Sequence, residues 1–404
     1  MSAGPTIEGM AATSEATLAA ARDFLQIDAH LTDEERDIRD TARAYAQAEL
    51  LPHVADWFEA GEVPVREVAR GLGGIGLLGM HLTGYGCAGT SATAYGAACC
   101  ELEAVDSGLR SLMSVQSSLA MYAIHVFGSE DQKQRWLPGM ARGELVGCFG
   151  LTEPDHGSDP AGMRTRARRD GGDWLLSGQK MWITNGSVSD VAVVWAHTDD
   201  GVRGFLVEAG APGFTTQDIH KKLSLRASVT SELVLDDVRV PDAALLPEVR
   251  GLRGPLSCLT SARMGIVWGA MGAARASLEA AVDYATTRTQ FDRPLAGFQL
   301  QQRKLALMAV EVHRGLLLAL HITRMNEAGT LRPEHVSFGK LANVRSAIDV
   351  CREARAVLGA NGVTLEYPVI RHMNNLESVL TYEGTEDVHQ LVVGQALTGV
   401  SAFR

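Results

Sequence analysis

The spacing of apolar residues divides the chain into three parts. Between residue 32 and about residue 143, apolar side chains recur every three or four positions, which is typical of helices with one buried face. Between about residues 146 and 240, short apolar runs are separated by Gly, Asp and Asn, which is typical of strands and turns. After Pro255 the helical spacing returns. The pattern therefore predicts helices, then strands, then helices again.

The first ordered helix is expected to start at Thr32. The run from Thr32 to Glu35 has the form of a capping box, and Ile38 then begins a series of apolar residues at helical spacing. Further buried helices are expected over 95–105 and 112–127.

The middle of the chain predicts an antiparallel β domain, a sandwich or barrel, of about 100 residues. Its clearest strands are expected over 174–176, 191–195, 205–207 and 232–235. Helices expected over 260–287, 299–326, 334–358 and 384–398 would pack as a four-helix bundle.

The fold class is therefore α+β. We expect a flexible leader over 1–30, an N-terminal helical domain over 31–145, a middle β domain over 146–254 and a C-terminal helical bundle domain over 255–404.

Composition narrows the class of protein. With 404 residues, 46% of them hydrophobic and 21% charged, the chain reads as globular, and no apolar run approaches the roughly 20 residues of a membrane span. A net charge of -11 argues against nucleic acid as a partner. The six cysteines form no C-x-x-C pair, so we expect buried thiols, no metal site and a reducing compartment. The G-x-G-x-x-G spacing falls only at 71–76, 74–79 and 84–89, inside the part predicted to be helical, so no predicted strand precedes it and it lacks the context of a nicotinamide signature.

The N-terminus has neither the charge nor the apolar core of a targeting segment. Glu8 and Glu15 are present, and no Arg precedes Arg22. A cytoplasmic location is the expectation.

The first candidate for chemistry is Glu383, in the segment 381–387 after an apolar stretch. A partly buried carboxyl on a Gly-Thr turn could act as a general base with a raised pKa. By itself such a glutamate is more often solvated or paired with an Arg.

Two loops could hold a planar, phosphorylated cofactor. The segment 149–160 offers hydroxyls and free backbone N–H groups, and 180–185 sets Trp182 and Thr184 two residues apart, on one face of a strand. Taken separately, each is also compatible with an ordinary loop or strand. His156 reads as a surface loop residue.

At this point the chain resembles the acyl-CoA dehydrogenase family, from about residue 30 to Phe403. Five separated motifs carry the resemblance, at 150–153, 182–184, 223–228, 288–291 and 382–385. It implies FAD as cofactor, with some contacts made across a subunit interface of a homotetramer built as a dimer of dimers. The FAD contacts so implied are Phe149, Leu151, Thr152, Gly157, Ser158, Trp182, Ile183, Thr184, Arg288, Phe291, Gln299, Ala356, Leu358, Gly359, Ala360, Thr385, Asp387 and Phe403.

Three positions depart from the family pattern. The family usually has Gln or Glu at Ala356, Gly or Ser at Ala360, and a small residue at His156. Some relatives carry their base on the helix beside Arg263, where this chain has Ala262. By this resemblance Glu383 is the catalytic base.

The substrate signal lies in 101–118, which resembles the branch of the family that acts on glutaryl-CoA. The resemblance implies that Arg110 and Ser111 bind the far carboxylate of the substrate, with Glu103 and Tyr382 as polar partners. Ser158, Arg263 and Gly384 match positions near the acyl-CoA. An arginine in an apolar pocket would select dicarboxylic chains, because a methyl end would leave its charge unpaired. The residues alone allow a simpler pairing of Arg110 with Asp106 or Glu103.

The activity implied is oxidation of glutaryl-CoA with loss of CO2 to give crotonyl-CoA, with electrons passed to an electron-transferring flavoprotein, usually in lysine and tryptophan breakdown. A short-chain or other dicarboxylic acyl-CoA dehydrogenase that does not decarboxylate is the alternative. A flavin oxidase or monooxygenase and a catalytically silent acyl-CoA-binding scaffold also stay open. Oxygen consumption would indicate the first of these, and a missing flavin absorbance band the second.

Overall fold

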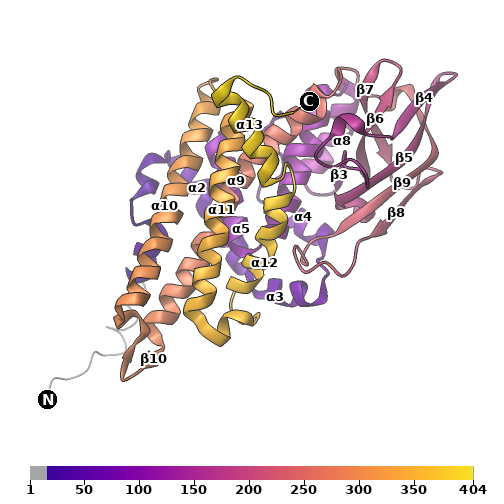
Figure 1. The fold of residues 1–404 in the computed structure, drawn as a ribbon. Coiled ribbons are helices and arrows are strands. Elements are labelled where there is room, and N and C mark those ends of the chain that lie inside the picture. The colour runs from indigo at the N-terminus through magenta and orange to yellow at the C-terminus, as the bar shows by residue number, and fades with distance from the viewer. Residues whose placement is uncertain (1–15, 404) are drawn as a thin grey trace.

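The computed structural model describes residues 16–403 and contains the three predicted parts (Figure 1). Long helices stand side by side, and the β domain lies at one side of them. The part of the predicted leader over 1–15 lies outside the described residues. The α+β class and the order helices, sheet, helices are confirmed.

The N-terminal domain is helical, as expected. Thr32 caps its first long helix with a capping box, in which Glu35 N donates to Thr32 Oγ1 at 3.2 Å and Thr32 N donates to Glu35 Oε2 at 2.9 Å. The domain contains α2 (Asp33–Tyr45), α3 (Leu51–Ala60), α4 (Val65–Gly74), α5 (Ala92–Val105), α6 (Ser107–Ser114), α7 (Tyr122–Phe127) and α8 (Glu130–Ala141), with the two-residue strands β1 (Thr83–Gly84) and β2 (Cys87–Ala88). Shorter turns are η1 (Ile27–His30) and the π-helical η2 (Ala46–Leu50) and η3 (Val115–Met121).

The β domain is a seven-stranded sheet in the order β3-β6-β4-β5-β9-β8, with β7 also paired to β6. Most pairs are antiparallel, but β3 pairs with β6 in parallel, and so does β4 through a single bridge. The antiparallel prediction was therefore incomplete, because β3 enters the sheet directly from the helical domain and no hairpin sets its direction. The strands are β3 (Gly147–Gly150), β4 (Arg166–Asp170), β5 (Asp173–Thr184), β6 (Val191–Thr198), β7 (Gly201–Glu208), β8 (Phe214–Asp218) and β9 (Thr230–Pro241).

The C-terminal domain has five helices where four were predicted. They are α9 (Arg253–Thr287), α10 (Gln299–Glu327), α11 (Pro333–Leu358), α12 (Val369–Thr381) and α13 (Glu386–Thr398), and a two-residue hairpin, β10 (Thr289–Gln290) with β11 (Arg293–Pro294), joins α9 to α10. The missed helix is α12. It buries Arg371, His372 and Asn375 along with Val369, Leu376 and Val379, so polar and apolar residues share its buried side.

Residues 16–30, expected in the flexible leader, pack against the bundle. Ile27 is buried, Arg22 Nη2 lies 2.9 Å from Glu279 Oε2 on α9, and Phe24 N donates to His313 Nε2 on α10 at 2.8 Å. This part of the leader is therefore a packed segment.

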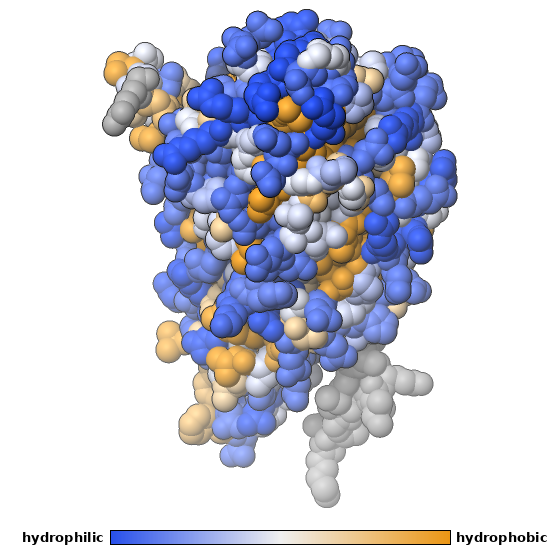
Figure 2. Space-filling model, turned by 90° about the vertical axis from the view of Figure 1, so that its right-hand side faces the viewer, coloured by the Kyte–Doolittle hydropathy of each residue, from blue (hydrophilic) through white to orange (hydrophobic). Residues whose placement is uncertain are grey.

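One described helix, α10, is long and apolar enough to cross a membrane, with a mean hydropathy of 1.6 over 18 residues. Core helices of bundles pass the same test, and 44% of this window is buried in the single chain. Viewed from the side of the β domain, apolar surface appears as separate patches between hydrophilic side chains (Figure 2).

Buried charge ties the two helical domains together. Glu101 on α5 is 3% exposed and accepts hydrogen bonds from Arg43 on α2, at 3.0 Å, and from Arg275 on α9, at 2.8 and 2.6 Å. Burial alone would raise the pKa of Glu101, but the two guanidinium groups outweigh it and lower the pKa to about 2.

We expect Glu101→Gln to lower the unfolding free energy by about 3 kcal/mol at pH 7, because Arg43 and Arg275 lose the buried carboxylate that they share and keep only longer ion pairs, with Asp40 at 3.7 Å and Glu279 at 3.4 Å. The folded-state pKa of Glu101 lies below its unfolded value, so its stabilisation is complete above about pH 4.5 and is lost as the pH falls towards 2. Urea denaturation of both proteins from pH 7 to pH 3 measures this, and the gap should narrow at low pH. The control Glu208→Gln removes a surface pair with Arg135 and should leave the midpoint nearly unchanged.

Candidate active site

The candidate base lies on a tight turn between α12 and α13. Glu383 has φ +51° and Gly384 has φ +94°, so both adopt the left-handed region that favours glycine. A Cβ on residue 384 would also lie 2.8 Å from His389 Nε2, so only glycine fits there. A non-glycine residue held in this region is typical of functional sites, where the surroundings oppose the strain.

Two cations hold the three carbonyl oxygens of this turn. Arg263 Nε on α9 donates to Glu383 O at 2.6 Å. Lys340 Nζ on α11 donates to Tyr382 O at 2.8 Å and to Gly384 O at 2.7 Å. The backbone on both sides of Glu383 is therefore fixed from two helices of the bundle.

The Glu383 carboxyl has the environment of a general base. Its Oε2 atom is buried and has no hydrogen-bond partner among the described residues. Burial raises the pKa of Glu383, while the charges of Arg110, Arg263 and Lys340 oppose that rise. A carboxylate in this state can take a proton from a bound molecule and later return it.

Arg110 lies beside this turn in a fully buried polar cluster. Its Nε donates to Glu103 Oε2 at 2.6 Å, and its Nη2 donates to the Tyr382 hydroxyl. The Ser111 hydroxyl lies 3.4 Å from the same Tyr382 oxygen. Burial disfavours the charge of Arg110, but Glu103 keeps its pKa raised well above the usual value. Both the predicted pairing with Glu103 and the predicted grouping with Ser111 and Tyr382 are present in the geometry.

A glycine on α9 makes room for this ion pair. A Cβ on Gly269 would lie 2.0 Å from Glu103 Oε2 and 3.2 Å from Arg110 Nε. The pair can form only because position 269 has no side chain.

The two loops predicted to hold a cofactor are adjacent. Met181 N donates to Thr152 O at 2.9 Å, and Lys180, fully buried, donates to Leu151 O at 3.1 Å and to Glu153 Oε1 at 2.8 Å. Burial raises the pKa of Glu153, but its hydrogen bonds and the Lys180 ammonium outweigh this effect and lower the pKa to about 2. Glu153 of the family motif is therefore a structural residue that joins the loop after β3 to β5.

Trp182, in the second of these two loops, has an exposed side chain. It sits at a bulge of β5 with φ +63° and is 59% exposed, next to the buried Ile183 and the half-buried Thr184. Phe149 and Leu151 are buried at the base of the loop, Thr152 is half-buried, and Gly157 and Ser158 are exposed. A flat aromatic face beside two hydroxyls fits the ring system of FAD.

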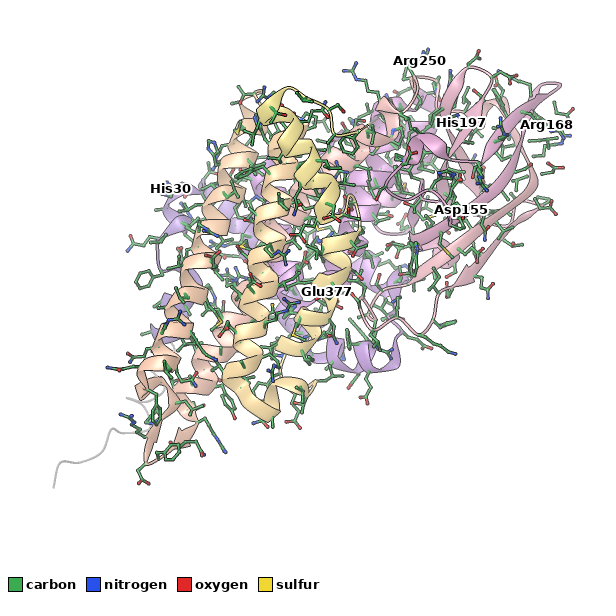
Figure 3. All side chains as sticks on the ribbon, in the orientation of Figure 1. His30, Asp155, Arg168, His197, Arg250 and Glu377 are labelled. Carbon is green, nitrogen blue, oxygen red and sulfur yellow. The ribbon has the colours of Figure 1, made fainter. Side chains whose placement is uncertain are left out.

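The surrounding segments can be placed in Figure 3. Asp155, in the loop after β3, lies on the β domain, and Glu377 lies on α12 in the bundle. His156 is half-buried in the same loop, with no metal-binding group of His, Cys, Asp and Glu among the described residues.

A second group of predicted cofactor residues lies elsewhere in the single chain. Arg288 precedes β10, Phe291 lies in the turn between β10 and β11, and Gln299 begins α10; Phe291 is 88% exposed. Figure 1 shows this hairpin at the end of the bundle remote from the β domain. Near the α11 terminus, Ala356 is half-buried, Leu358 is buried, and Gly359 and Ala360 are exposed. The chain does not bring these residues to Trp182, so their role stays a prediction that needs a second subunit.

The remaining predicted residues follow the catalytic turn. Thr385 caps α13 by accepting from Val388 N at 3.2 Å, Asp387 is exposed in the first turn, and Phe403 is 41% exposed at the C-terminal end. Ala262 is buried on α9 and offers no second base.

Sequence reasoning missed three residues that build the site. Lys340, Lys180 and Gly269 lie within ordinary helix or strand patterns. A lysine at an otherwise buried position is the signal that the sequence offers for the first two. For Gly269 no local signal exists, because its neighbour Glu103 is far away in the sequence.

Fold and site together place a carboxyl oxygen without a hydrogen-bond partner among the described residues near a buried arginine, with the exposed Trp182 on a separate β domain. Family models for the N-terminal, middle and C-terminal domains of acyl-CoA dehydrogenase match residues 32–144, 148–238 and 249–398. The chain belongs to the acyl-CoA dehydrogenase family.

Individual proteins agree with this assignment. A solved structure of glutaryl-CoA dehydrogenase from Mycobacterium smegmatis is 66% identical with a TM-score of 0.94, covering 95% of this chain and 99% of that one. A second, of a glutaryl-CoA dehydrogenase from the same organism in complex with FADH2, is 59% identical with a TM-score of 0.94, covering 95% and 100%. The mitochondrial short-chain specific acyl-CoA dehydrogenase of Bos taurus is 35% identical over 365 residues, 88% of each chain. Acyl-CoA dehydrogenase activity is the function these findings support.

We expect Gly269→Ala to push the Glu103 carboxylate away from Arg110. The unfolding free energy should fall by about 1 to 3 kcal/mol, the usual effect of overpacking a core, as measured by chemical denaturation. A crystal structure of the variant should show a longer separation between Glu103 Oε2 and Arg110 Nε. The control Gly74→Ala, where a Cβ would meet nothing within 4 Å, should change neither. An unchanged ion pair in Gly269→Ala would contradict this role of the glycine.

Proposed function

We propose that this protein oxidises glutaryl-CoA and decarboxylates the product, giving crotonyl-CoA and CO2. The observation that carries the proposal is Arg110, buried beside the catalytic turn and held there by Glu103 and Tyr382. A cation in this position suits an acyl chain that ends in a carboxylate. The 66% and 59% identical glutaryl-CoA dehydrogenases support the same choice.

FAD is the cofactor, and Thr152, Trp182 and Thr184 are the residues of this chain best placed to hold its ring. When bound, FAD accepts the hydride that leaves the β-carbon of the acyl group. The FADH2 complex of the 59% identical protein supports this assignment.

Glu383 acts first as a base. Its unpaired carboxylate removes a proton from the α-carbon, which the thioester acidifies, as the hydride departs from the β-carbon. The backbone N–H of Glu383 has no hydrogen-bond partner among the described residues, so it is available to the thioester oxygen. A donor at that oxygen stabilises the negative charge that develops there.

Arg110 binds the far carboxylate of the substrate. Its Nε and Nη2 are engaged by Glu103 and Tyr382, and Nη1 has no hydrogen bond among the described residues. The hydroxyls of Ser111 and Tyr382 offer further donors. A methyl end in this pocket would leave Arg110 without the second anion, which disfavours monocarboxylic substrates.

Decarboxylation follows from the product of the oxidation. In glutaconyl-CoA the far carboxylate is conjugated, through the new double bond, to the thioester. Breaking its C–C bond releases CO2 and leaves the electron pair in a dienolate, and the Glu383 carboxyl returns its proton to give crotonyl-CoA. Glu383 is thus base and then acid.

The alternative is a dehydrogenase that stops before decarboxylation or prefers short monocarboxylic chains. The 35% identical short-chain relative favours this reading. Measuring CO2 and crotonyl-CoA from glutaryl-CoA, with butyryl-CoA as competing substrate, separates the two functions.

The partners are also proposals. Electrons from the reduced cofactor pass to an electron-transferring flavoprotein, as the family resemblance implies. A homotetramer would bring the residues around β10 of one subunit to the β domain of another. Six cysteines without disulfides fit a cytoplasmic location.

Glu383→Gln is expected to keep bound FAD and to lose reduction of the flavin by glutaryl-CoA by about 10³-fold or more, because an amide cannot take the α-proton. Loss of absorbance near the flavin band in an anaerobic stopped-flow experiment measures the rate. The control Glu386→Gln, three residues along and paired with Arg345, should be reduced at nearly the normal rate. Rapid reduction of Glu383→Gln would remove this residue from its role.

Arg110→Met is expected to lower kcat/KM for glutaryl-CoA by about 10²-fold to 10³-fold and to raise the relative rate with butyryl-CoA, because the carboxylate loses its charged partner. The single substitution leaves Glu103 buried without a counter-charge, so Arg110→Met with Glu103→Gln serves as the matched variant. A preference for glutaryl-CoA that survives in both variants would contradict dicarboxylic recognition by Arg110.

A further inference from the structure

We propose that Lys340 is a positioning residue for the base: it fixes the backbone on both sides of Glu383 and supplies the buried positive charge that favours the ionised carboxylate. The proposal rests on the proposed role of Glu383. It concerns a residue that was not among the predicted site residues but binds the backbone of two of them, Tyr382 and Gly384.

The first observation is the reach of Lys340 across the turn. Lys340 on α11 is 1% exposed, and both of its hydrogen bonds go to backbone oxygens of the residues that flank Glu383. An ammonium in this position would normally seek a carboxylate. No salt bridge to Lys340 is present among the described residues, so its bonding capacity is directed to the turn.

The second observation is the conformation that these bonds hold. A non-glycine residue in the left-handed region is strained, and Glu383 lies there with φ +51°. Lys340 binds the oxygen of the peptide before Glu383, and Arg263 binds the oxygen of the peptide after it. With both peptide planes fixed, the direction of the Glu383 side chain is fixed as well.

The third observation is electrostatic. The charged and titratable groups around Lys340 are Glu383 and Tyr382 on the turn, Arg263 on α9, Arg110 on α6 and His389 on α13. Burial lowers the pKa of Lys340, and the Glu383 carboxylate opposes that fall.

Burial also holds the pKa of His389 low, at about 3, so at neutral pH its ring adds no charge to the set. Glu383 is then the group whose ionisation Lys340 supports. Without Lys340 the pKa of Glu383 should rise further, because one of the three cations that oppose the effect of burial on this pKa is gone. The fraction of ionised base at a given pH would fall, and the acid limb of the pH profile would move to higher pH.

If Lys340 had only a structural role, its removal would have a different effect. If Lys340 only satisfied two carbonyl oxygens, its removal would lower stability and leave the pH profile of the proton transfer in place. The position of the acid limb therefore separates the two roles.

The test compares Lys340→Met, which removes charge and hydrogen bonds, with Lys340→Gln, which removes the charge and keeps an amide donor. Lys304→Met is the matched control, since Lys304 lies on the same bundle and makes one partly exposed ion pair with Glu353. Each full-length holoenzyme is measured for FAD content and melting temperature. Anaerobic reduction by glutaryl-CoA is then followed from pH 5.5 to pH 9, with substrate binding determined separately.

Lys340→Met is expected to slow reduction by about 10²-fold on the plateau, the scale of a misplaced catalytic group, with substrate affinity changed by less than about threefold. Its acid limb should move up by about 1 pH unit. Lys340→Gln should recover much of the plateau rate and keep the shifted limb. A crystal structure of Lys340→Met should show Glu383 outside the left-handed region.

An FAD-loaded Lys340→Met with an unchanged acid limb and an unchanged Glu383 conformation would overturn the proposal. If that variant does not fold, Lys340→Gln decides alone, and a limb at the normal pH overturns it. Wild type and Glu383→Gln are run in parallel. If wild type is not reduced, or Glu383→Gln is, the proposed function fails, and the crystal structure then tests the positioning role by itself.

Discussion

Buried charged side chains hold the elements of this molecule in their arrangement. Each pairs with a group from a distant part of the chain. Glu101 joins α2, α5 and α9, and Lys180 joins the loop after β3 to β5 through Glu153. A buried charge that loses its partner destabilises a protein by several kcal/mol, so each pair opposes other arrangements of its elements. Domain arrangement and cofactor surface thus depend on the same constraint.

In the candidate active site, the buried charges are only partly paired. Arg110 has Glu103, and Lys340 has backbone oxygens, but Glu383 Oε2 has no partner in the described chain. Nearby cations oppose the effect of burial on this carboxyl without forming a hydrogen bond to it. The chemistry proposed for Glu383 needs such a group, because a fully paired carboxylate would be a weak base.

The elements that the sequence predicted are those that local interactions determine. The capping box at Thr32 and the long apolar spacing of α9, α10 and α11 were sufficient to place those elements close to their observed bounds. The segment that forms α12 was not predicted, although Val369, Leu376 and Val379 recur at helical spacing; it also buries polar side chains whose partners lie elsewhere, as Arg371 does with Asp106. The parallel pairing of β3 likewise depends on a long-range contact.

For the site, recognisable motifs identified Glu383, Trp182 and Arg110 as candidates, and the structure shows how each is supported. Gly269 gives no local signal, and Lys340 is marked only as a lysine at an otherwise buried position, because the importance of both comes from what lies opposite them in space. The family resemblance could identify the candidate reacting groups. The residues that hold these groups in position are seen only in the structure.

The turn that carries Glu383 is short and has positive φ angles, features usually associated with mobile loops. Its carbonyl oxygens are nevertheless bound from α9 and α11, while Tyr382 N donates to Ser378 O within α12. Opening this turn therefore means separating helices of the bundle core. The turn should therefore move only when those helices separate, so a segment that is a loop in secondary structure belongs to the rigid core in its dynamics.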